Sequence, residues 1–180
     1  LTDQFAKALV YAEGKHHTQV RKGGDIPYVG HLLSVAGLVI NDGGTEEQAI
    51  AALLHDAVED QGGPDTLEEI RATFGEDVAR IVAECSDTDK VPKPPWRQRK
   101  QDYVDHLTDV GTDTLLVSVA DKLDNARSML RDYREHGPQL WQRFTVKDPN
   151  DHLWYYGELL AAYRSRGFTS WMVDELGRVV

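Results

Sequence analysis

The sequence has little cysteine and no long apolar run. Cys85 is its single cysteine, which excludes an internal disulfide framework and fits a reducing compartment. No stretch is apolar for long enough to cross a bilayer, and the start of the chain does not resemble a signal peptide. We therefore expect a cytoplasmic protein in which Cys85 is a small buried residue of a helix rather than a nucleophile.

Basic charge is also scarce. The chain has 20 lysines and arginines against 30 aspartates and glutamates, which gives a formal net charge of −10. A protein with this balance is a poor candidate for binding nucleic acid or an anionic membrane surface. We expect a small-molecule partner, and an anionic one would have to meet a local basic cluster or a metal ion. The residues leave open whether the chain forms a homo-oligomer.

Strand-like alternation is absent, and apolar residues recur at spacings of three and four. Thr45 with Gln48, and Thr66 with Glu69, resemble capping boxes that open helices. Residues 87–96 hold three prolines and predict a loop. The expected helices have the approximate bounds 5–17, 32–40, 45–59, 66–74, 76–85, 96–107, 112–133, 153–163 and 170–176. Because 180 residues suit one domain, we predict one compact all-α bundle over residues 1–180.

Two polar residues interrupt the apolar helix "AALLHDAVED", residues 51–60. His55 and Asp56 occupy positions where a buried, unpaired charge is costly or shifts its pKa. His31 in "PYVGHLLSVA" and Asp121 in "LLVSVADKLDNA" interrupt two other apolar helices. Any one of the four could be a satisfied core or capping residue. Together, two imidazoles and two carboxylates suit Mn²⁺, Fe²⁺ or Zn²⁺, and we predict that they bind one metal ion.

Glu59 and Asp60 follow the His55-Asp56 pair by one helical turn. A carboxylate in this position can orient and deprotonate a water molecule beside a metal ion. A solvated helix end is the alternative, but carboxylates are unfavourable at a helix C-terminus because of the helix dipole. We therefore predict that Glu59 and Asp60 are catalytic.

Basic and amide side chains lie in the sequence close to the predicted ligands. Each could be an ordinary surface residue, but phosphates require such donors, and arginine can also stack on a base. The candidate residues are Arg21 and Lys22 ahead of His31, Arg97, Arg99 and Lys100 after the proline-rich loop, and Lys122, Asn125, Arg127 and Arg131 after Asp121. The nearby His16 and His17 could contact the same pocket, but we expect them to be solvated helix residues. The aromatic group Trp141, Trp154, Tyr155 and Tyr156 could stack on a nucleotide, but we expect it to serve packing or a subunit contact.

The order His31, His55-Asp56, Asp121 matches the H…HD…D pattern of the HD superfamily of metal-dependent phosphohydrolases. The longer strings "RKGGDIPYVGHLLSVA", "AALLHDAVED", "IRATFGEDVARIVAECSDT" and "VADKLDNARSM" resemble the hydrolase domain of RelA/SpoT homologues and the small alarmone hydrolases. The resemblance covers residues 3–131 and implies an HD-domain helical bundle. It divides the chain into a motif-bearing core, residues 1–131, and a helical cap, residues 132–180.

The resemblance also implies a reaction and a role for each site residue. The four ligands would hold one Mn²⁺, and Glu59 and Asp60 would handle the nucleophilic water. Arg21 would stack on the purine, Lys22 and Asn125 would hold the base and ribose, and Arg127 would support the site from behind. Independently of the resemblance, we expect Lys100 to bind substrate. The implied reaction is removal of pyrophosphate from the ribose 3′ position of (p)ppGpp, which leaves GDP or GTP, by a stand-alone hydrolase.

The chain departs from the family pattern in two places. The usual "ADRLHN" is "ADKLDN" here, with Lys122 and Asp124 in place of arginine and histidine, and residues 86–107 are unusually rich in proline. Two other functions therefore stay open. One is the same chemistry on another nucleotide, such as ppApp or the 2′-phosphate of NADPH, and the other is a non-catalytic nucleotide sensor. The presence of Glu59 and Asp60 favours catalysis over sensing.

Overall fold

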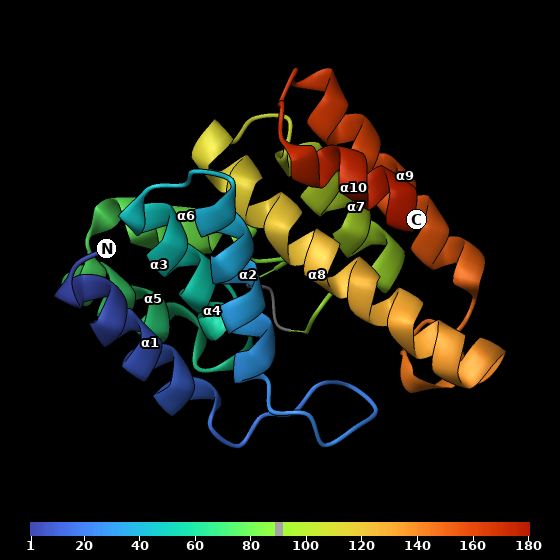
Figure 1. Ribbon diagram of the computed structural model, residues 1–180, viewed down its shortest axis with the longest axis horizontal. Coiled ribbons are helices and arrows are strands. Elements are labelled where there is room, and N and C mark those ends of the chain that lie inside the picture. Colours follow the sequence, from blue (N-terminus) through green and yellow to red (C-terminus); the bar gives the residue numbers. More distant parts are fainter. Residues whose placement is uncertain (89–91) are drawn as a thin grey trace.

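The computed structural model describes residues 1–88 and 92–180, and these residues form helices without any strand (Figure 1). One isolated bridge joins Val20 to Pro27 in the loop after the first helix. The all-α prediction is therefore confirmed. The helices are α1 (Asp3–His16), α2 (Val29–Asn41), α3 (Glu46–Leu54), α4 (Ala57–Asp60), α5 (Gly63–Phe74), α6 (Glu76–Cys85), α7 (Trp96–His106), α8 (Thr112–His136), the 3₁₀ helix η1 (Gly137–Arg143), α9 (Pro149–Ser165) and α10 (Trp171–Val179).

Of the two predicted capping boxes, only the first is present. The Thr45 hydroxyl accepts from the Gln48 backbone N–H, and the Gln48 side chain accepts from the Thr45 backbone N–H. Thr66 instead lies inside α5, where its hydroxyl donates to the Gln61 carbonyl at 2.7 Å. That helix begins earlier, at Gly63, because Gly62 can adopt a positive φ (124°) just before it.

The helix predicted to run through Glu59 is interrupted, which corrects the sequence reading. α3 ends at Leu54 and α4 begins at Ala57, so His55 and Asp56 form the corner between them. Asp56 has φ −98° and ψ −4°, in the sparsely populated bridge region that many active-site residues occupy. An unbroken helix would direct the His55 and Asp56 side chains about 100° apart. The corner instead brings the His55 imidazole and the Asp56 carboxylate close together.

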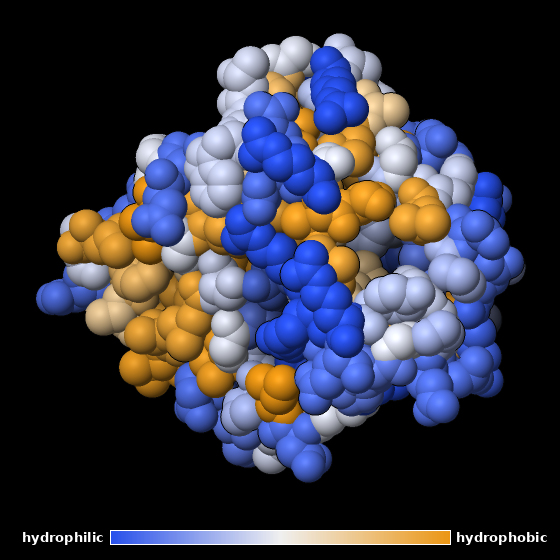
Figure 2. Space-filling model, turned by 45° about the vertical axis from the view of Figure 1, so that its right-hand side comes forward, coloured by the Kyte–Doolittle hydropathy of each residue, from blue (hydrophilic) through white to orange (hydrophobic). Residues whose placement is uncertain are grey.

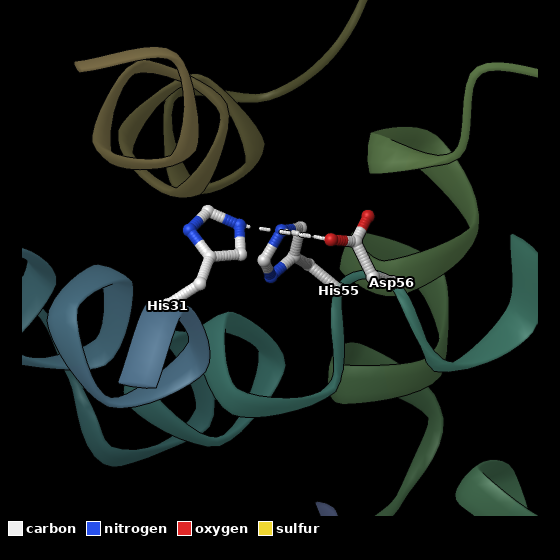
Figure 3. A group of neighbouring side chains, drawn as sticks. All are labelled: His31, His55 and Asp56. Atoms are coloured by element: carbon white, nitrogen blue, oxygen red, sulfur yellow. Dashed lines mark ion pairs between the residues drawn. The ribbon is translucent and has the colours of Figure 1, made fainter. Parts of the chain in front are cut away.

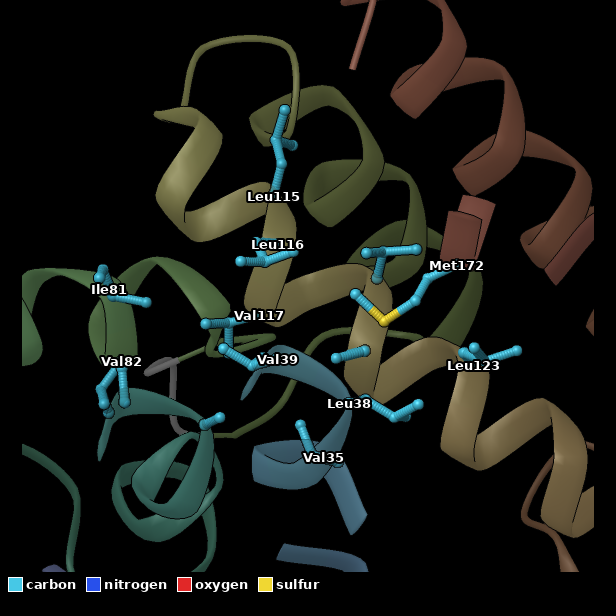
Figure 4. Close-up of a cluster of buried hydrophobic side chains, with 14 of the residues drawn as sticks. Val35, Leu38, Val39, Ile81, Val82, Leu115, Leu116, Val117, Leu123 and Met172 are labelled. Carbon is cyan, nitrogen blue, oxygen red and sulfur yellow. The ribbon is translucent and has the colours of Figure 1, made fainter. Parts of the chain in front are cut away.

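The long helix α8 organises the interior. It packs against α2, α3, α6 and α10, and its first four turns are almost entirely buried. Figure 4 shows this core, in which side chains from α2, α6 and α10 pack against those of α8. The labelled members are Val35, Leu38, Val39, Ile81, Val82, Leu115, Leu116, Val117, Leu123 and Met172. Because this core holds α2, α3 and α8, polar side chains that point inwards from these helices have fixed positions.

The C-terminal helices cover α7 and α8. α9 packs on α7, and α10 packs on α8 and α9. Tyr155 and Tyr156 are buried, and Trp154 contacts the Trp96 ring with centroids 6.4 Å apart, so these three aromatic residues serve packing as expected. Trp141 stacks on His152 at 5.2 Å.

The molecular surface is mixed. Figure 2 shows a band of strongly hydrophilic side chains between apolar patches on one face. A cleft of about 700 Å³ beside α8 and α10 is lined by Arg127, Leu130, Arg131, Arg134, Glu135, Glu175, Arg178 and Val179. Among the described residues, no helix combines the length and apolar character needed to cross a membrane.

Candidate active site

Three of the predicted ligands meet at the inner ends of α2 and α3 (Figure 3). His31 comes from the first turn of α2, and His55 and Asp56 come from the corner between α3 and α4. The Asp56 Oδ2 atom lies 3.0 Å from His55 Nε2 and 3.7 Å from His31 Nε2. One ligand atom from each residue lies within 4.8 Å of the other two, which is close enough for all three to bind one metal ion.

Asp121 reaches the same point from α8. Its Oδ1 atom lies 3.2 Å from His31 Nε2 and 3.5 Å from His55 Nε2. The structure therefore brings together all four side chains that the sequence singled out. Both Nε2 atoms are buried and have no hydrogen-bond partner within the described part of the chain. Buried nitrogens rarely stay unpaired, so two of them facing two carboxylates fit a divalent cation.

Neighbouring residues also hold three of these four side chains. The His55 Nδ1–H donates to the Ala52 carbonyl at 2.8 Å. The Tyr28 hydroxyl donates to Asp56. On α8, the Lys122 ammonium donates to Asp121 Oδ2 at 2.6 Å, and the Asn125 amide donates to Asp121 Oδ1 at 2.5 Å. These contacts fix the ligands in place before any cation binds.

The carboxylates of this site raise the pKa values of both histidines. Burial lowers the pKa of His31, but the carboxylates of Asp121, Asp124 and Asp56 outweigh it and raise that pKa to about 9. Burial also lowers the pKa of His55, and the charge on Asp56 then holds it well above its usual range. Without a cation, both imidazoles therefore carry protons at neutral pH, and a cation would take the place of those protons.

Glu59 and Asp60 lie in α4 and point to different neighbours. The Lys93 ammonium donates to Glu59 Oε1 at 2.8 Å, and the Asp87 backbone N–H donates to Glu59 Oε2 at 3.3 Å. The Gln19 amide donates to Asp60 Oδ2 at 2.7 Å. Burial raises the pKa of Asp60, and the negative charge of Asp56 raises it further.

His16 differs from its prediction as a solvated helix residue. It is only 2% exposed, and its ring stacks on Tyr28 with centroids 5.4 Å apart. Its Nδ1 atom lies 2.7 Å from Gln19 Oε1, and the Gln61 amide donates to that same oxygen at 2.6 Å. His16 and Gln61 therefore orient the Gln19 amide, which in turn holds Asp60.

The predicted substrate-binding residues fall into two groups. Arg21 lies near the cluster, with its Nη2 atom 3.9 Å from Asp124 Oδ2, and Asn125 contacts Asp121 directly. The Lys100 ammonium donates to Asp87 Oδ2 at 3.1 Å, beside the Glu59 contact, and burial lowers its pKa. The structure does not bring the other two residues to the cluster. Lys22 is exposed, and Arg127 pairs with Glu175 of α10 at 3.0 Å.

Several residues at the site carried no signal in the sequence. Tyr28 and Gln19 contact Asp56 and Asp60, but nothing in their sequence surroundings marks them. Asp124, by contrast, was noticed in the sequence as a departure from the family motif. It accepts from the His31 Nδ1–H at 2.6 Å. Cys85, which was expected to be buried, is half-buried at the end of α6, and burial raises the pKa of its thiol.

Comparisons with known proteins identify the family of this chain. The HD domain family matches residues 8–149. The guanosine-3′,5′-bis(diphosphate) 3′-pyrophosphohydrolase MESH1 of Xenopus tropicalis is 38% identical over 145 residues, which cover 79% of this chain and 76% of that protein. The corresponding human MESH1 is 34% identical over 148 residues, which cover 81% of this chain and 78% of that one.

Solved structures show the same fold. The structure of lmo0812 from Listeria monocytogenes EGD-e superposes with a TM-score of 0.69 at 30% identity and covers 83% of this chain and 95% of that one. A metazoan ortholog of SpoT that hydrolyzes ppGpp superposes with a TM-score of 0.66 at 27% identity, over 94% and 98% of the two chains. With these matches along most of its length, the chain belongs to the HD domain family, together with the MESH1 guanosine-3′,5′-bis(diphosphate) 3′-pyrophosphohydrolases.

Proposed function

We propose that this protein removes pyrophosphate from the ribose 3′ position of guanosine 3′,5′-bis(diphosphate) and its 5′-triphosphate analogue. The observation that carries the proposal is the pair of buried, unpartnered Nε2 atoms of His31 and His55, which face carboxylate oxygens of Asp56 and Asp121. The MESH1 relatives, whose names state this activity, support the choice of substrate.

The cation that we propose for this site is Mn²⁺. Two imidazole nitrogens and two carboxylate oxygens form a mixed donor set that suits Mn²⁺, and Fe²⁺ or Zn²⁺ would also fit. His31, His55, Asp56 and Asp121 would hold it. When bound, such a cation supplies Lewis acidity to phosphoryl oxygens and to the attacking water.

The hydrolysis requires one proton to leave the water and one to reach the leaving group. The water oxygen forms a bond to the phosphorus attached to the ribose 3′ oxygen, the bond between that phosphorus and the 3′ oxygen breaks, and pyrophosphate departs. Asp60 takes the proton from the water, because burial and Asp56 raise its pKa above the ordinary value. It then gives that proton to the departing ribose 3′ oxygen, which becomes the 3′ hydroxyl of GDP or GTP. Glu59, held by Lys93 and the Asp87 amide, orients the water.

The remaining predicted residues act on the substrate. Arg21 stacks its planar guanidinium on the purine, Lys22 and Asn125 hold the base and ribose, and Lys100 binds the phosphates. Arg127 acts from behind the site, since its ion pair with Glu175 ties α8 to α10 just beyond Asn125. In this proposal residues 1–131 form the catalytic core and residues 132–180 the helical cap, and the protein acts in the cytoplasm.

The test is a product analysis. Purified protein is incubated with guanosine 3′,5′-bis(diphosphate) in the presence of Mn²⁺, and anion-exchange chromatography follows GDP and pyrophosphate, which should form in equal amounts. Glu135→Gln, which alters an exposed carboxylate on α8, is the control and should react like the wild type. Adenosine 3′,5′-bis(diphosphate) and NADPH in parallel reactions measure base and phosphate preference. A metal-loaded protein that forms neither GDP nor pyrophosphate contradicts the proposal.

A further inference from the structure

Asp124 lies on α8 between the ligand Asp121 and Asn125, and it reaches across to α2. Its Oδ2 atom accepts from the His31 Nδ1–H at 2.6 Å. Its Oδ1 atom accepts from the hydroxyl of Ser34, one turn beyond His31 on α2. One carboxylate therefore contacts two successive turns of α2, and its side chain is only 19% exposed. Arg21, 3.9 Å from Oδ2, partly balances its charge.

These contacts determine which nitrogen of His31 is free to bind a cation. A neutral imidazole carries one N–H, and the acceptor beside it decides where that proton lies. Asp124 accepts at Nδ1, so the lone pair remains on Nε2, which faces Asp121 and has no hydrogen-bond partner in the described structure. His55 reaches the same tautomer by a different contact, since its Nδ1–H donates to a backbone carbonyl, that of Ala52.

The two histidines therefore differ in the charge of their supporting acceptor. A carboxylate that accepts from a ligand imidazole makes the opposite nitrogen more basic and a stronger metal ligand than a neutral carbonyl does. His31 has the charged acceptor and His55 the neutral one. Asp124 also bridges two helices, so a purely structural role as a link between α2 and α8 is the alternative that an experiment must separate.

We propose that Asp124 is a positioning residue that sets the tautomer and orientation of His31 and thereby determines how tightly this site holds its divalent cation. Ser34 supports it by donating to its second oxygen. The proposal rests on the metal centre proposed above. It adds a fifth carboxylate-bearing position to the site, one that influences the cation through His31 rather than by contact.

The test measures Mn²⁺ affinity by isothermal titration calorimetry on the chelator-treated full chain. Asp124→Leu should weaken binding by about 10- to 100-fold, the usual cost of losing such a partner. Asp124→Asn keeps an acceptor but loses the charge, so its affinity should fall between those of Asp124→Leu and the wild type. Glu135→Gln makes the same carboxylate-to-amide change at an exposed position on the same helix and should bind like the wild type.

A second measurement separates positioning from a structural link. In ¹⁵N-histidine NMR of the Zn²⁺-loaded protein, His31 should show a protonated, slowly exchanging Nδ1 in the wild type. In Asp124→Asn, that proton should exchange faster with water, while the His55 Nδ1–H stays unchanged. A mere link between helices would lower the unfolding temperature of the metal-free protein without altering His31 selectively.

The outcomes distinguish this proposal from the metal centre itself. If the wild type binds Mn²⁺ and both Asp124 variants bind it within about twofold of the wild type, the role of Asp124 is overturned and the metal centre stands. If the wild type binds no divalent cation, the metal centre fails and the proposal fails with it. A selective loss in both Asp124 variants, with Glu135→Gln unaffected, supports the proposal.

Discussion

Binding of a divalent cation to this protein should release protons. In the metal-free site the surrounding carboxylates overcome the effect of burial and raise the pKa of His31 to about 9. At pH 7 the imidazole is therefore almost fully protonated, and a cation that takes Nε2 must displace that proton. The competition costs about 2.7 kcal/mol at pH 7, from two pH units at 1.36 kcal/mol each. The pKa of His55 is also raised, so a second proton contributes.

The affinity for Mn²⁺ should therefore rise as the pH rises. Between pH 7 and 8, deprotonation of His31 alone should raise the apparent association constant for Mn²⁺ about tenfold. Calorimetric titrations in buffers of different ionisation enthalpy give the number of protons released, which should lie between one and two at pH 7. His106→Asn, which changes an exposed histidine far along α7, should leave that number unchanged. Binding without proton release, with an affinity that is the same at both pH values, would refute the reasoning.

The same pKa has a consequence for the metal-free fold. The folded pKa of His31, about 9, exceeds the ordinary value of 6.5, so its stabilising contribution is complete below pH 6.5 and is lost as pH rises towards 9. The difference corresponds to on the order of 3 kcal/mol of unfolding free energy. Urea denaturation of the chelator-treated protein at pH 6.5 and 9 measures it. With Mn²⁺ bound, this loss should disappear, because the cation has already taken the place of the proton.

Three substitutions test other parts of the site and fold. Glu59→Gln should lower turnover by at least about 100-fold, measured by steady-state kinetics, while guanosine 3′,5′-bis(diphosphate) still binds in equilibrium dialysis. A loss of binding affinity with little loss of turnover would contradict this role. Gln19→Leu removes the donor to Asp60, so kcat should fall about tenfold with KM nearly unchanged; an unaltered kcat would show that Asp60 needs no such support. Thr45→Ala removes the cap of α3 and should lower the unfolding free energy by about 1 kcal/mol, measured by urea denaturation, and an unchanged midpoint would contradict the capping role.

Local patterns were sufficient to predict the helical fold, because apolar spacing along one element reports which of its faces is buried. They also marked His31, His55 and Asp121, each of which places a polar group on an apolar face. The corner at His55 and Asp56 could not be predicted in this way. Helical periodicity continues across it, so the sequence pattern contains no signal for the break between α3 and α4.

The supporting contacts depend on residues far apart in the sequence. Asp124 meets His31 across 93 positions, and Gln19 meets Asp60 across 41. His16 was misjudged for the same reason, since a histidine near a helix end is usually solvated, and only the fold places Tyr28 over its ring. A single sequence contains no signal for such pairs, because either partner alone is an ordinary polar residue.

The most direct test of the metal centre is a crystal structure of the Mn²⁺-loaded protein with anomalous diffraction data. The predicted result is one strong anomalous peak within bonding distance of the Nε2 atoms of His31 and His55 and of carboxylate oxygens of Asp56 and Asp121. A map without a peak between these four side chains, or with the cation held by other residues, would contradict the claim on which the proposed reaction depends.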